Sequence, residues 1–71
     1  MPIDFANLSL LIADTPAQIR RNDVYRLLEE AQRLGVLEDC AVWLLRQRPD
    51  LLPTIAADLQ GLTGEVWHPT L

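Results

Sequence analysis

Apolar residues recur at helical spacing along most of this 71-residue chain. The repeat is interrupted at Gly35 and again at Pro49, so the stretch from Thr15 to Gly61 divides into three amphipathic segments. An apolar stripe that returns every 3.6 residues is typical of a helix that buries one face. The pattern therefore predicts three consecutive helices, with a shorter apolar segment before them.

The first two helices are predicted from their capping residues. Asp4 can cap a short helix over residues 5–13. Thr15 is a suitable N-cap for a second helix that ends near residue 34, Pro16 fits its first position, and Gln18 stands where a capping box places Glu or Gln. Its predicted core stripe consists of Ile19, Val24, Leu27, Leu28, Ala31 and Leu34.

The third predicted helix, residues 37–48, has no polar side chain in its middle. Acidic residues lie in its first turn and arginines in its last, which suits the helix dipole. A helix that is apolar all round must be buried on more than one side. The residues predicted to face the core are Leu37, Ala41, Leu44 and Leu45. This leaves Val42 and Trp43 on another side of the helix.

The fourth predicted helix has Asp50 as its N-cap, Pro53 in its first turn and Gly61 at its end. Its stripe consists of Leu52, Ile55, Ala56 and Leu59. Residues 62–71 show no helical period and are predicted to form a non-helical tail, with a short extended piece at residues 65–67. The expected fold is an all-α domain over residues 1–61, a small bundle of four short helices of which the second is the longest.

Composition narrows the class of protein. The 49% hydrophobic content is too high for a disordered chain, and no apolar run approaches the roughly 18 residues of a membrane span. No positively charged segment precedes the N-terminal apolar patch, so no signal peptide is expected. The single cysteine, Cys40, allows no intrachain disulfide and fits a reducing cytoplasm. The start at Met1 and the capped helices favour a complete small protein.

The net charge of −4 disfavours binding to nucleic acid or to an anionic membrane. All six basic residues are arginine, which favours a GC-rich bacterial or phage genome as the source. A domain of this size buries only about 60% of its unfolded surface and is marginally stable alone. With no disulfide and no metal to stabilise it, we expect another protein, or a second copy of the chain, as a partner.

No set of side chains predicts catalysis, a metal site or a cofactor site. Cys40 lies in an apolar helical run, where a thiol is unreactive. His68, the single histidine, lies in the predicted tail. The acidic pairs Glu29–Glu30 and Glu38–Asp39 are adjacent residues that do not share a helix face. The chain is therefore predicted not to be an enzyme.

A helix-turn-helix DNA-binding regulator is the alternative prediction. Ala31 and Gly35, with a helix on either side, match the small residue and the turn of that motif. The first turn of the presumed recognition helix, however, carries Glu38 and Asp39, which repel phosphate.

The segment from Leu27 to Ile55 resembles the closing half of the effector-associated, death-like helical domains of bacterial defence proteins. The shared features are a small residue, a turn glycine, a leucine-rich helix and a proline before a further helix, here Ala31, Gly35, Leu37, Leu44 and Pro49. This resemblance implies an adaptor that pairs with like domains and carries no catalytic residues.

The remaining large side chains indicate where a protein partner would bind. Aromatic residues and arginine are the usual anchors of interfaces. We predict contact residues Val42, Trp43 and Arg46 on the third helix, with Tyr25 beside them and Trp67 in the tail. Two alternatives stay open: Trp43 completes the core or anchors an interface, and Trp67 folds back over the bundle or docks on a partner.

Overall fold

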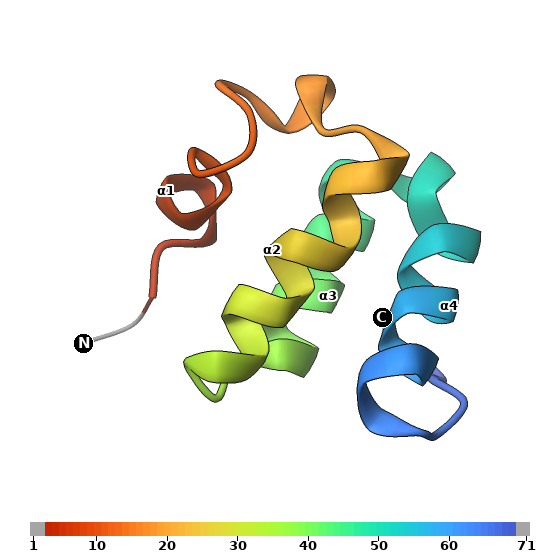
Figure 1. Cartoon of the computed structure of the whole chain (residues 1–71). Helices are drawn as coiled ribbons and strands as arrows, with labels where there is room; N and C mark the ends of the chain where they lie inside the picture. Colours follow the sequence, from red (N-terminus) through yellow and green to blue (C-terminus); the bar gives the residue numbers. More distant parts are fainter. Residues whose placement is uncertain (1–2, 70–71) are drawn as a thin grey trace.

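The protein is all-α, as predicted, in a computed structural model that describes residues 3–69. The helices are α1 (Phe5–Ser9), α2 (Arg21–Arg33), α3 (Leu37–Gln47) and α4 (Leu52–Thr63), and the described residues include no strand (Figure 1). Single 3₁₀ turns, η1 (Pro16–Gln18) and η2 (Pro49–Leu51), precede α2 and α4. The prediction that the second helix is the longest is confirmed. No helix among residues 3–69 combines the length and hydrophobicity that crossing a bilayer requires.

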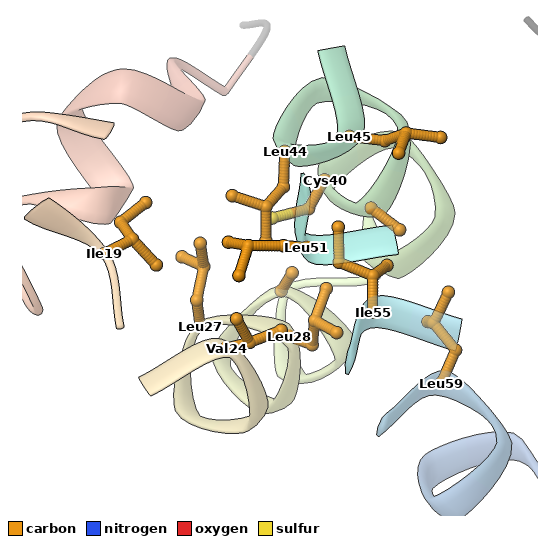
Figure 2. Packing of buried hydrophobic residues seen from close by; sticks show 12 residues of the cluster. Ile19, Val24, Leu27, Leu28, Cys40, Leu44, Leu45, Leu51, Ile55 and Leu59 are labelled. Carbon is orange, nitrogen blue, oxygen red and sulfur yellow. The ribbon is translucent and has the colours of Figure 1, made fainter. Parts of the chain in front are cut away.

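The core lies between α2, α3 and α4, which pack against one another in pairs (Figure 2). Each of these helices buries one apolar face, which is how amphipathic segments of this length become stable. The buried apolar residues are Ile19, Val24, Leu27, Leu28, Ala31, Cys40, Ala41, Leu44, Leu45, Leu51, Ile55 and Leu59. All the residues of the stripe predicted for the second helix are among them except Leu34, which follows α2 and is 42% exposed.

The turn between α2 and α3 follows the sequence prediction. Gly35 has a φ of 77° and ends the helix. The backbone N–H of Val36 donates to the carbonyl of Ala31 at 2.9 Å, and that of Gly35 to the carbonyl of Gln32 at 3.0 Å. These two bonds form a Schellman motif, which satisfies carbonyls that a helix end leaves free. The motif turns the chain back so that α3 packs along α2.

The predicted extents of the first two helices were wrong. α1 is capped by Asp4 as expected, with Oδ1 accepting from the backbone N–H of Ala6 at 3.0 Å, but it ends at Ser9 and the chain turns over residues 10–13. The Thr15 side chain caps nothing, and the helical turn that follows stops at Gln18. Ile19 is extended, at φ −65° and ψ 125°, and α2 begins at Arg21. Burial of Ile19 from an extended segment overrides the local helical pattern.

The fourth helix also departs from its prediction at both ends. Asp50 does not cap it, and Leu51 takes the core position predicted for Leu52, which is 39% exposed. Gly61 lies inside α4, and the helix continues to Thr63 and ends at Gly64, whose φ is 78°. The non-helical tail therefore begins after residue 63, two residues later than predicted.

The described part of the tail returns to the bundle at Trp67. Trp67 is half-buried and packs against the core cluster, which matches the lid alternative for this side chain. The extended piece predicted at residues 65–67 forms no strand.

Candidate protein-binding surface

The solvent-facing side of α3 brings together three of the predicted contact residues. Cys40, Ala41, Leu44 and Leu45 are buried on the opposite side. Asp39, Val42, Trp43 and Arg46 follow one another at spacings of three, one and three residues, which places them in one row along the helix. We call these four residues the α3 stripe. Asp39 and Arg46 are exposed, whereas Val42 and Trp43 are half-buried.

The α3 stripe lines an open depression of about 600 Å³ together with Phe5, Glu38 and Gln47. The rings of Phe5 and Trp43 lie 6.1 Å apart between centroids and are tilted by 39°. Trp43 also packs against the core cluster, so the indole has one side toward the bundle and another toward the depression. The core alternative thus describes part of the environment of Trp43, and the interface alternative stays a prediction.

Phe5 is a member of this surface that sequence reasoning missed. Its place in the pattern predicts only that it faces the protein from the first helix. Residues 10–20, which form no α-helix, separate α1 from α2 (Figure 1), and the pattern does not specify where such a connection places α1. The structure places Phe5 against Trp43, which enlarges the apolar centre of the depression.

Tyr25 and Trp67 lie apart from the α3 stripe. A Cβ atom on Gly61 would be 4.0 Å from Cε2 of Tyr25, so the tyrosine ring lies over α4. Trp67 lines a smaller depression of about 230 Å³ with Leu37, Leu59, Thr63 and Val66 among others. Glu38 borders both depressions. The indole Nε1 of Trp67 is buried and has no hydrogen-bond partner among residues 3–69.

Other apolar side chains are exposed away from the α3 stripe. Leu10 and Leu11 follow α1 and are 56% and 64% exposed, and Val66 in the tail is 64% exposed. Leu11 falls within the helix predicted over residues 5–13, but α1 ends at Ser9, before this residue.

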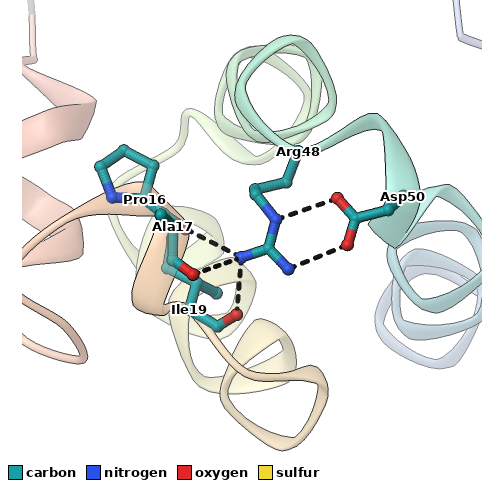
Figure 3. A network of polar contacts seen from close by, with 5 residues as sticks. All are labelled: Pro16, Ala17, Ile19, Arg48 and Asp50. Atoms are coloured by element: carbon teal, nitrogen blue, oxygen red, sulfur yellow. Dashed lines mark hydrogen bonds and ion pairs between the residues drawn. The ribbon is translucent and has the colours of Figure 1, made fainter.

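Arg48 joins the end of α3 to the segment before α2 (Figure 3). Its Nη1 donates to the carbonyl oxygens of Pro16, Ala17 and Ile19 at 3.0, 3.1 and 3.0 Å. Nε and Nη2 donate to the two carboxylate oxygens of Asp50, each at 2.9 Å. These hydrogen bonds hold the pKa of the Asp50 carboxyl below its ordinary value. We assign Arg48 a structural role, since its donors are directed at the protein itself.

The groups most often used in catalysis are poorly placed for it. Burial raises the pKa of the Cys40 thiol to about 12, and the thiolate is the form that reacts. His68 is exposed in the tail. Within residues 3–69, no three His, Cys, Asp or Glu side chains are grouped so as to hold a metal ion.

No family model, no curated protein and no solved structure matches the chain. The resemblance to effector-associated domains therefore stays a prediction.

Proposed function

We propose that this chain is a non-enzymatic protein–protein interaction domain, a cytoplasmic adaptor or regulator that binds through the α3 stripe. The observation that carries the proposal is the composition of one surface: Val42, Trp43 and Phe5 form an apolar centre, and exposed Arg46 lies beside it. Interfaces are enriched in aromatic residues and arginine, and a few such residues near their centre contribute most of the binding energy.

The side chains at this surface do not favour catalysis. The one thiol is buried with a raised pKa, and the depression at the α3 stripe holds two carboxylates but no histidine or cysteine. Open apolar surface next to a few charged side chains suits contact with another protein better than capture of a small polar substrate.

The surface charge also disfavours the DNA-binding alternative. Glu38 and Asp39 are exposed in the first turn of α3, where a recognition helix meets bases and phosphates. Duplex DNA of random sequence should therefore not bind at low salt. Binding that weakens steeply as salt is added would instead support the DNA-binding alternative.

A photo-crosslinking residue at position 42, introduced in the source cells, tests the proposal. We expect crosslinks to a defined protein or to the chain itself, and none from the same residue at position 57, which is exposed on α4. The purified partner should then bind wild-type protein, and Trp43→Ala should weaken binding by about 2 kcal/mol or more, roughly 30-fold.

Two further variants separate binding from folding. Arg46→Ala, at an exposed position, should weaken binding without lowering the thermal unfolding temperature. Leu11→Ala removes an exposed apolar side chain outside the stripe and should bind normally. Equal losses for Leu11→Ala and Trp43→Ala would contradict the assignment of the surface to α3.

A further inference from the structure

We propose that the partner is a second copy of this chain, and that two α3 helices pair antiparallel about a twofold axis midway between Val42 and Trp43. The inference rests on the proposed function because it uses the same surface. It adds the identity of the partner, the relative direction of the two helices and their register.

The order of residues in the α3 stripe makes this surface complementary to itself. Asp39 and Arg46 stand at opposite ends, and their midpoint coincides with the midpoint of Val42 and Trp43. A twofold axis through that point places Asp39 beside Arg46 of the partner subunit and Val42 beside Trp43 of the partner subunit. A twofold interface requires that one patch fit its own copy in this way.

Charge selects the antiparallel direction. In a parallel pair, each Asp39 would meet the same aspartate of the second copy, and each Arg46 the same arginine. In the antiparallel pair, an aspartate meets an arginine at each end of the stripe. The two helix dipoles also point in opposite directions, which is favourable. Asp39 and Arg46 are exposed, and neither forms an ion pair within the described part of the chain, so both are available to a second copy.

The rest of the surface has the composition of a small interface, with an apolar centre and a polar edge. Phe5 packs beside Trp43 and extends the apolar centre, while Glu38 and Gln47 provide a polar edge. The 11 residues of α3 span about 16 Å, so the contact is smaller than that of tight complexes. We therefore expect a reversible dimer with a dissociation constant in the micromolar range.

Charge reversal at the two ends of the stripe tests the register. Asp39→Arg and Arg46→Asp should each weaken self-association by about tenfold or more, because every reversal places like charges together twice in a symmetric dimer. The double variant Asp39→Arg/Arg46→Asp has the composition and net charge of the wild type and should recover association. An equimolar mixture of the two single variants should also form a dimer. Sedimentation velocity from low to high micromolar concentration measures all four.

The matched control for Asp39→Arg is Glu29→Arg, which changes the net charge by the same amount at an exposed position on α2 and should associate like the wild type. Circular dichroism at each step reports whether a variant is folded. A wild-type chain that stays monomeric at high micromolar concentration overturns the inference, and so does a double variant that is folded and monomeric. In either case, crosslinks from position 42 to a different protein would leave the proposed function standing.

Discussion

At the scale of single residues, Arg48 stands out because it is bonded to parts of the chain about 30 positions away. Its guanidinium donates hydrogen bonds to three backbone carbonyls and one carboxylate. The sequence pattern places an arginine near the end of a helix, where it suits the dipole, but gives no sign of these partners. A proline follows it, which disfavours helical backbone at residue 48 and leaves its side chain outside the helical row.

Replacing Arg48 should lower stability more than replacing another paired arginine. Arg48→Ala removes the donors to Pro16, Ala17 and Ile19 and leaves those carbonyls to water, and Arg48→Lys keeps the charge but loses the planar fork. The matched control is Arg33→Ala, because among the described residues the polar partner of Arg33 is Glu30, one turn away on the same helix. We expect the order of unfolding temperatures to be wild type, Arg33→Ala, Arg48→Lys, Arg48→Ala. Equal decreases in unfolding temperature for Arg33→Ala and Arg48→Ala would contradict the structural role assigned to Arg48.

The buried Cys40 thiol should make the protein less stable at alkaline pH. Its pKa is about 12 in the folded state and about 8.5 in an unfolded chain. Stability is complete below pH 8.5 and decreases as pH rises toward 12, because only the unfolded chain then loses the proton. The decrease is up to about 1.4 kcal/mol for each pH unit in that window. Urea unfolding of wild type and Cys40→Ala, compared from pH 8 to pH 10, isolates this contribution; curves that stay parallel would contradict it.

At the scale of helices, the two glycines near the end of α4 have opposite roles. Gly61 lies inside the helix, and a Cβ there would meet only Cε2 of Tyr25, at 4.0 Å. Gly64 has a φ of 78° and ends the helix, with no atom near its missing Cβ. From the sequence alone, either glycine can end the helix, and the helical pattern predicted that Gly61 does.

Alanine substitutions should therefore change stability in opposite directions. Gly61→Ala should stabilise the fold by about 0.5–1 kcal/mol, because glycine inside a helix loses more backbone entropy on folding than alanine. Gly64→Ala should destabilise it by about 1–2 kcal/mol, the cost of left-handed backbone for a residue with a Cβ. Chemical denaturation of the two variants measures both signs. Destabilisation by Gly61→Ala would mean that α4 ends before residue 61.

Helix existence was predictable here, whereas several helix ends were not. The stripe of α2 from Val24 to Ala31 and the buried side of α3 follow directly from spacing. The start of α2 does not, because Thr15 and Pro16 begin a helical turn that Ile19 leaves in order to reach the core. A local capping signal carries no information about the core that Ile19 reaches from extended backbone. Tertiary packing therefore overrides the local helical preference.

At the scale of the whole molecule, the position of α1 was beyond the sequence pattern. Its connection to α2 contains only a single 3₁₀ turn, and its five residues are too few to form a stable helix alone. The candidate surface was predicted as far as it lies on α3, since Val42, Trp43 and Arg46 share one helix. Phe5, which comes from another element, and the separation of Tyr25 and Trp67 required the three-dimensional arrangement.

Hydrogen exchange should divide the molecule into two parts. α1 is only five residues long, and although Ser9 is buried, Phe5 and Leu8 are only half-buried, so its amides should exchange through local opening. Amides at Leu28 and Leu44, which are fully buried, should exchange only through global unfolding. Native-state exchange in increasing denaturant measures the two free energies. Equal protection of α1 and α2 would show that the protein opens as one unit.

The Schellman turn at Gly35 has a consequence for the order of folding. It joins α2 to α3 through three residues, so these helices can meet before any long loop has to close. A chain dominated by such local contacts folds on the order of microseconds to milliseconds. Leu28→Ala or Leu44→Ala should then slow refolding in stopped-flow experiments, whereas Phe5→Ala should mainly speed unfolding. The α2–α3 hairpin would thus form first, and α1 would join it after the rate-limiting step.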